Sequence, residues 1–216
     1  MTSLGLKVSS YLVLLYVQHH IKSLAMPLTP EHKQRSRQKI LKSAFILFTE
    51  HGFENVSIDQ IMKKAGMTRG AFYAHFSSKS NLYKESISYS TLRSSLLKVK
   101  NESLSDKEWV EQLLHEYLSS NHSTGISATR CPLAFLTTDI ALRDSLIRST
   151  YSDIYKNMNK RILEYTKSYS NCDSDRMLAI TSMIIGGVAI GRALSDENLT
   201  EKVLDSCYTV ANELLD

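Results

Sequence analysis

The side chains of residues 57–79 include groups that could contact a polyanion. Arg69 has a planar guanidinium that can donate two hydrogen bonds to the edge of a guanine, and Thr68 beside it offers a hydroxyl. Gly70 would allow close backbone approach, and Ala71 could meet a thymine methyl. The groups suited to phosphate oxygens are Ser57, Tyr73, His75 and Lys79. These types predict recognition of nucleic acid, with Arg69 and Thr68 reading bases.

Two short helices are expected to position these groups. Ser57 and Gln60 form a capping-box pattern that begins one helix, Gly66 ends it, and Thr68 begins a second helix that runs to about Ala74. Helices this short need a shared core, and the apolar residues available for it are Phe45, Phe48, Phe53, Val56, Ile61, Phe72 and Phe76. The pattern predicts a helix-turn-helix from about residue 57 to 76, whose second helix can enter a major groove about 12 Å wide.

Longer helices are expected around this pair. One runs from about residue 29 to Gly52, and Ser78 caps another that extends towards Lys100. No segment alternates polar and apolar residues with period two, so the fold class is predicted to be all-α. Further helices are expected at about 106–120, 131–141, 144–169, 174–194 and 199–215.

Charge is divided unevenly along the chain. Residues 30–100 contain 13 Lys and Arg against 5 Asp and Glu, whereas residues 101–216 contain 11 against 17. A basic segment beside an acidic remainder is typical of a polyanion-binding module joined to another function. The expected domains are an N-terminal extension (1–28), a helix-turn-helix DNA-binding domain (29–77), a linking helix (78–100) and a second helical domain (101–216).

Three stretches resemble the DNA-binding domain of the TetR/AcrR family of transcriptional regulators. They are residues 40–53 (ILKSAFILFTEHGF), 57–66 (SIDQIMKKAG) and 69–79 (RGAFYAHFSSK). The resemblance covers about residues 30–85, and the Phe-Tyr-x-His-Phe-x-x-Lys ending is its most specific part. Asn81 departs from the family, which usually has an acidic residue before Leu82; the difference concerns helix capping. A Cys-Pro motif at residues 130–136 is a weaker sign of one branch.

The resemblance implies a homodimer of subunits with about nine helices. The first three would bind double-stranded operator DNA, and the remainder would bind a small-molecule inducer and dimerise. The expected function is an inducer-responsive repressor that binds a palindromic operator in the cytoplasm, associated with the nucleoid and not with a membrane. The alternatives are an activator, a non-inducible DNA-binding protein with the same domain, and a helical ligand-carrying protein.

The C-terminal helices carry the expected dimer interface. Residues 180–192 are apolar on nearly every face, with Gly187 and Gly191 allowing close helix approach, so a four-helix bundle across a two-fold axis is predicted. Ordinary packing within one chain is the alternative. The interface residues proposed from the sequence are Ile184, Gly187, Gly191, Val203, Cys207 and Val210.

A ligand pocket is expected among the helices between the DNA-binding domain and this pair. Its candidate lining residues, each of which could instead be core, are Trp109, Tyr117, Cys131, Phe135, Tyr151, Tyr155 and Met158. Cys131 stands at the start of a predicted helix, where the helix dipole lowers a thiol pKa, so it could sense oxidants. The alternative is a buried structural cysteine.

The sequence carries no pattern for catalysis or metal binding. Its three cysteines are widely spaced without a Cys-x-x-Cys pair. Glu111 and His115 share a helix face but lack the second Glu and the second Glu-x-x-His of a di-iron bundle, and there is no Gly-rich phosphate loop. We therefore predict that the chain is not an enzyme and has no cofactor or metal.

The first 25 residues admit three interpretations. The apolar run at residues 11–17 is too short to span a bilayer. Met26 begins a segment typical of a cytosolic start, so the preceding residues could be an upstream extension outside the native protein. A helical arm and an export signal are the alternatives.

Overall fold

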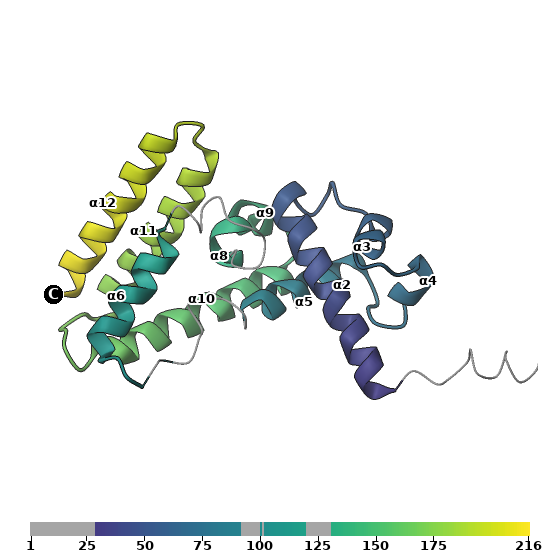
Figure 1. Ribbon diagram of the computed structural model, residues 1–216, viewed down its shortest axis with the longest axis horizontal. Helices are drawn as coiled ribbons and strands as arrows, with labels where there is room; N and C mark the ends of the chain where they lie inside the picture. The colour runs from purple at the N-terminus through teal and green to yellow at the C-terminus, as the bar shows by residue number, and fades with distance from the viewer. Residues whose placement is uncertain (1–28, 92–99, 101, 120–130) are drawn as a thin grey trace, which may run out of the picture. The chain divides into compact units, whose positions relative to one another are not determined.

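The computed structural model describes residues 29–91, 100, 102–119 and 131–216, which form ten helices and no strand (Figure 1). The predicted all-α fold class is confirmed. The chain divides into two compact units, residues 1–38 and 39–216, with the boundary inside helix α2 (Pro30–His51). The contacts below lie within the second unit. The N-terminal extension, with Met26, and residues 92–99 of the linking helix lie outside the described residues.

The predicted helix-turn-helix is present between two longer helices. Helix α3 (Ile58–Lys64) begins with the predicted capping box, in which the Ser57 hydroxyl accepts from the backbone N–H of Gln60. Helix α4 (Arg69–Phe72) is shorter than predicted: residues 73–75 form a turn, in which the backbone N–H of His75 bonds to the Phe72 carbonyl at 2.9 Å. Ser78 caps α5 (Lys79–Thr91) as predicted, through a 3.0 Å bond from the Asn81 N–H.

The aromatic residues of this region form the shared core that such short helices require. Phe48 packs edge-on against Tyr83 at 4.8 Å between ring centroids and lies 5.8 Å from Phe53. Of the seven predicted core residues, six are buried and Phe53 is partly buried. Burying one such side chain is worth about 1.5–3 kcal/mol, so this core holds α3 and α4 at a fixed angle.

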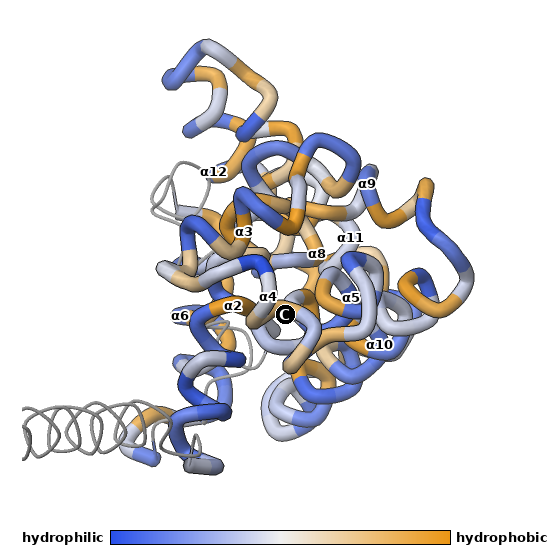
Figure 2. Tube along the Cα trace, turned by 90° about the vertical axis from the view of Figure 1, so that its right-hand side faces the viewer, coloured by the Kyte–Doolittle hydropathy of each residue, from blue (hydrophilic) through white to orange (hydrophobic). Residues whose placement is uncertain are grey.

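Six helices make up the rest of the residues that the structure describes, and four of them begin with a Ser or Asp side chain that accepts a backbone N–H bond. The predicted helix at 131–141 is two helices, because Leu136 leaves the helical conformation at φ −121°. The polar and apolar positions along them can be followed in Figure 2. These helices are α6 (Asp106–Tyr117), α8 (Pro132–Phe135), α9 (Thr137–Ala141), α10 (Ser145–Thr166), α11 (Ser174–Ala193) and α12 (Glu197–Leu215).

Helix α11 is the central helix of this part. It packs against α12, α10 and α8, and its buried residues include Ile180, Ile184 and Val188. By length and composition alone it could cross a membrane, a test that core helices also pass. Because its apolar residues serve these intrachain contacts, we interpret it as a core helix.

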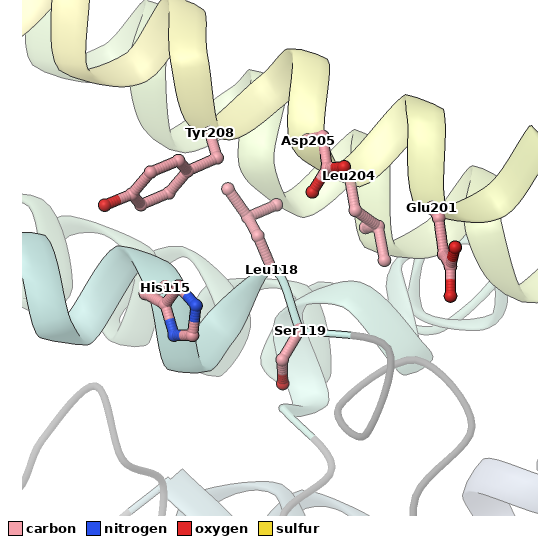
Figure 3. A pocket seen from close by; sticks show the side chains of 7 residues that line it. All are labelled: His115, Leu118, Ser119, Glu201, Leu204, Asp205 and Tyr208. Carbon is pink, nitrogen blue, oxygen red and sulfur yellow. The ribbon is translucent and has the colours of Figure 1, made fainter.

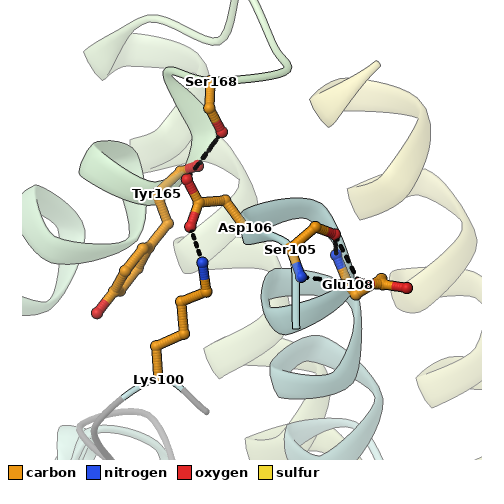
Figure 4. A network of polar contacts seen from close by, with 6 residues as sticks. All are labelled: Lys100, Ser105, Asp106, Glu108, Tyr165 and Ser168. Carbon is orange, nitrogen blue, oxygen red and sulfur yellow. Dashed lines mark hydrogen bonds and ion pairs between the residues drawn. The ribbon is translucent and has the colours of Figure 1, made fainter. Parts of the chain in front are cut away.

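A polar network fastens the start of α6 (Figure 4). The Asp106 carboxylate accepts hydrogen bonds from the Lys100 ammonium and, at 2.9 Å, from the Ser168 hydroxyl. These two bonds lower the pKa of Asp106. Lys100, the expected end of the linking helix, is thereby tied to the start of α6 and to the residues that follow α10.

Two glycines of α11 face α12 of the same chain. A Cβ atom at Gly187 would lie 2.7 Å from the Cys207 Sγ, and one at Gly191 would lie 3.2 Å from a methyl of Thr200. Ile184 is also fully buried. Within the described chain these three residues therefore take part in intrachain packing, which was the alternative to the predicted dimer interface.

We expect Gly187→Ala to lower stability although alanine favours helices. The added methyl would overpack the α11–α12 contact at a cost of about 1–3 kcal/mol, against a helix-propensity gain of about 1 kcal/mol. Thermal unfolding should show a melting temperature lower by roughly 2–6 °C. Adding Cys207→Ala removes the atom that clashes, so Gly187→Ala should then cause no loss relative to Cys207→Ala alone. An equal loss in both backgrounds would contradict this packing.

Candidate nucleic-acid interface

The turn between α3 and α4 sets the geometry of the candidate site. Gly66 has φ +70°, a left-handed conformation that favours glycine. The N–H of Met67 bonds to the Met62 carbonyl at 2.9 Å and closes the end of α3. Phe72, on the inner side of α4, is fully buried. The opposite side of α4 is thereby held outward on a rigid support.

Five of the eight predicted DNA-contacting residues are exposed: Ser57, Thr68, Arg69, Gly70 and Tyr73. Arg69 and Tyr73 have the largest side chains of these five residues, and they are 63% and 61% exposed. A Cβ at Gly70 would meet no atom within 4 Å, so the backbone there is open to a ligand. The Ser57 hydroxyl also bonds to the Gln60 side chain at 2.9 Å, so the helix cap already uses it. These positions form one outward surface around α4.

The other three predicted contacts, Ala71, His75 and Lys79, are half-buried. Ala71 packs against the core, and the His75 ring lies beside that of Phe76. The Lys79 ammonium lies 4.2 Å from the centroid of the Phe53 ring, and burial lowers its pKa. In the described structure Lys79 therefore contacts protein, and its role as a phosphate contact stays a prediction.

Asp59 joins this surface, which sequence reasoning did not foresee. Its carboxylate accepts a 2.7 Å hydrogen bond from the Arg69 guanidinium. Asp59 lies in the first turn of α3, where the helix dipole favours a negative charge. The bond uses one guanidinium nitrogen, so donors remain for a base edge. An aspartate two residues after the capping serine was the available signal, but nothing in the sequence placed it beside Arg69.

The predicted pocket residues are mainly core. Trp109, Tyr117, Cys131, Phe135 and Met158 are buried. Burial, together with the neighbouring Cys131, raises the pKa of Tyr117. The half-buried Tyr151 and Tyr155 bond to the Leu133 carbonyl and to Thr181, each at 3.0 Å. Buried Cys131 fits the structural alternative better than an accessible sensor thiol.

A groove of about 300 Å³ lies elsewhere, between α6 and α12 (Figure 3). His115 from α6 faces Tyr208 from α12, with 5.9 Å between the ring centroids. None of the predicted pocket residues lines it. Within the described part of the chain no group of three metal-binding side chains occurs, and no disulfide joins the cysteines.

The exposed apolar residues of α11 and α12 lie on other faces than the two buried glycines. On α11 they include Leu178 and Ile190, at 43% and 54% exposed; on α12 they include Leu199 and Val210. A Cβ at Gly186 would meet no atom within 4 Å. Of the remaining interface predictions, Val203 and Cys207 are half-buried and Val210 is exposed.

Comparison with known proteins relates the helix-turn-helix to a described family. Residues 40–85 match the family described as "Bacterial regulatory proteins, tetR family". The chain is 46% identical over 57 residues to the HTH-type transcriptional regulator AcrR of Shigella flexneri, covering 26% of each chain. It is 42% identical over 48 residues to the transcriptional repressor AcnR of Corynebacterium glutamicum, covering 22% of this chain and 26% of the relative. The chain thus spans about a quarter of the length of these curated relatives.

The likeness in fold extends much further. A TetR transcriptional regulator from Legionella pneumophila superimposes with a TM-score of 0.66 over 82% of this chain and 96% of that structure, at 22% identity. Residues 40–85 therefore carry the helix-turn-helix sequence of the TetR family, as the resemblance predicted, and the fold is like that of a TetR regulator. These relatives are named as regulators and not as enzymes, in agreement with the sequence prediction.

Proposed function

We propose that the protein is a DNA-binding transcriptional regulator that represses transcription by binding a palindromic operator as a homodimer. One observation carries this: α4 holds the Arg69 side chain outward, 63% exposed, on a helix-turn-helix of TetR type. The basic charge of residues 30–100 supports it, since phosphate contacts supply much of the affinity for DNA. Its place of action would be the cytoplasm, on the nucleoid.

The roles of the exposed residues follow from their chemistry. Arg69 reads a guanine through two hydrogen bonds, a contact that discriminates by about 1–3 kcal/mol. Thr68 contacts a neighbouring base edge, and Gly70 lets α4 approach it. Half-buried Ala71 keeps the thymine-methyl contact proposed from the sequence. Tyr73 donates to a phosphate and thereby sets register rather than sequence. Ser57, His75 and Lys79 are the further phosphate contacts proposed from the sequence.

Selection from random duplex DNA tests this function. Repeated binding and amplification with the purified full chain should enrich an inverted repeat whose half-site centres lie one helical turn apart, about 34–36 Å. Affinity for the enriched duplex should fall steeply with salt concentration. Enrichment of no sequence, or of an unpaired motif, would contradict a dimeric repressor.

The homodimer is proposed on the exposed faces of α11 and α12. Both helices expose large apolar side chains, among them Ile190 on α11 and Val210 on α12. Two such pairs across a two-fold axis would form a four-helix bundle. Half-buried Gly186, where a Cβ would meet no atom within 4 Å, would allow close approach of a second subunit.

Response to a small-molecule inducer is the further part of the proposal. Trp109 is only 8% exposed, and its indole N–H has no hydrogen-bond partner among the described residues. Buried polar groups are normally satisfied, so a bound molecule with an acceptor would suit this place. Such a ligand would weaken DNA binding to the extent that it binds the DNA-free conformation more tightly than the DNA-bound conformation. An activator or a non-inducible binder would differ in the position of its footprint relative to the promoter.

Asp59→Asn tests whether Asp59 orients the reading arginine. We expect about a fivefold loss of discrimination between the selected duplex and a duplex altered at the base pair that Arg69 contacts. This loss is smaller than the full discrimination that the arginine contact provides. Binding to random DNA should tighten, because a negative charge near the phosphates is removed. Both are measured by fluorescence anisotropy.

Two controls separate orientation from general charge. Asp175→Asn removes an exposed carboxylate from the first turn of α11 and should leave discrimination unchanged. In an Arg69→Ala background, Asp59→Asn should no longer alter discrimination, as a double-mutant cycle requires. Equal discrimination by Asp59→Asn and the unaltered protein would refute the orienting role.

A further inference from the structure

A single carboxylate from α9 holds the turn between α2 and α3. The Asp139 Oδ1 accepts the backbone N–H of Phe53 at 3.1 Å. Its Oδ2 accepts the hydroxyl of Tyr83 on α5. Asp139 is 86 residues from Phe53 and 56 from Tyr83 in the sequence, so it joins the two parts of the chain on either side of the linking segment.

Arg143 extends this contact along the same turn. Its guanidinium pairs with Glu54 and lies 4.8 Å from the centroid of the Phe53 ring. Its Nε lies 3.8 Å from the Asp139 Oδ2. The side chains of Arg143 and Asp139 are largely buried, at 9% and 19% exposed. A buried charge this well paired holds its neighbours in one geometry, because losing one partner leaves the others unsatisfied.

Gly52 makes the close approach of this carboxylate possible. Its φ of +75° lies in the left-handed region, and a Cβ there would stand 3.3 Å from the Asp139 Oδ1. A side chain at position 52 would therefore both strain the turn and press on the carboxylate. Burial and the Asp139 carboxylate raise the pKa of Tyr83, so its hydroxyl remains a donor throughout the usable pH range.

We infer that Asp139 is a positioning residue for DNA binding: it sets the orientation of the helix-turn-helix relative to the C-terminal helices α6 to α12. It touches no DNA itself and acts through Phe53 and Tyr83. This inference rests on the proposed dimeric, operator-binding function. In a dimer the orientation of each helix-turn-helix determines whether both α4 helices reach half-sites one DNA turn apart.

The Asp139 contact should affect the affinity for a duplex with two half-sites, and not the affinity for a single half-site. Once one subunit is bound, the second binds at an effective concentration set by how well its orientation matches the spacing. Loosening the Asp139 contact widens the range of orientations and lowers that concentration. Contacts within a single half-site, made by α3 and α4, do not change.

The experiment compares affinities for a duplex with two half-sites and a duplex with one, both taken from DNA selected by the unaltered protein. We expect the unaltered protein to prefer the double site by at least about a hundredfold. Asp139→Ala should reduce this preference about tenfold, leave the single-site affinity within about twofold, and bind equally well when one base pair is inserted between the half-sites. Asp139→Asn and Tyr83→Phe, milder changes, should show the same effects more weakly if the alanine variant does not fold.

A pair of glycine variants provides the matched control. Gly52→Ala strains the backbone and presses on Asp139, whereas Gly66→Ala strains the backbone where a Cβ would meet nothing within 4 Å. Only Gly52→Ala should lower the preference for the double site; Gly66→Ala should change both affinities in proportion.

The possible results separate the two claims. A purely structural role would lower the single-site and double-site affinities of Asp139→Ala in the same proportion, and that result overturns the inference, as does an unchanged preference. If the unaltered protein itself does not prefer the double site, the proposed dimeric function fails instead.

Discussion

Arg69→Ala should abolish most of the sequence selectivity of DNA binding. The arginine is the most exposed donor on α4 and the one side chain there that can bond to two acceptors of a guanine. Its loss should reduce discrimination between the selected duplex and random DNA by roughly tenfold to a hundredfold at each half-site. Fluorescence anisotropy titrations at a fixed salt concentration measure both affinities.

A matched arginine separates base reading from net charge. Arg148 is exposed on α10, and Arg148→Ala removes the same charge away from the predicted surface. It should leave selectivity intact. Circular dichroism should show that both variants keep the helical content of the unaltered chain. Arg69→Ala with undiminished selectivity would mean that α4 is not the reading helix.

Ile190→Glu should convert the proposed dimer to monomers. Ile190 is 54% exposed on α11, and a carboxylate there would be desolvated and unpaired across a two-fold contact. Sedimentation velocity should give the mass of one chain, and affinity for the two-half-site duplex should fall about a hundredfold or more with the loss of bivalency. Val210→Glu should act in the same way from α12.

An equally exposed leucine elsewhere supplies the control. Leu146 on α10 is 60% exposed, so Leu146→Glu makes the same kind of change outside the proposed contact. It should remain dimeric. If all three glutamate variants stay dimeric, the contact lies on another face; if the unaltered chain is a monomer at micromolar concentration, the homodimer proposal is wrong.

The helix-turn-helix could be predicted because its signals are local. Ser57 and Gln60 stand three residues apart in one capping box, and Gly66 marks a turn that needs positive φ. Phe48 continues the apolar face of Leu41 and Ala44 along α2, and its burial follows from that pattern. Each of these features depends on a few neighbouring residues, which is the range over which sequence patterns determine conformation.

Contacts between distant segments could not be predicted in this way. α11 is apolar on nearly all sides, so its sequence could not show that Gly187 faces α12 while Gly186 faces outward. Asp139 reads as an ordinary helical carboxylate, and its bond to Phe53 depends on tertiary packing. The motif assigned Lys79 to a phosphate contact. In the structure its ammonium lies over the ring of Phe53, a contact that depends on tertiary packing.

The most direct test is a gel-shift titration of the purified chain on the DNA upstream of its own gene, with an equal length of shuffled sequence as competitor. We expect a retarded complex that unlabelled specific duplex displaces and unlabelled shuffled duplex does not. This complex should weaken steeply as salt concentration rises, and Arg69→Ala should fail to form it. Equal displacement by both competitors, or selective binding that Arg69→Ala retains in full, would contradict the claim that this helix-turn-helix reads an operator.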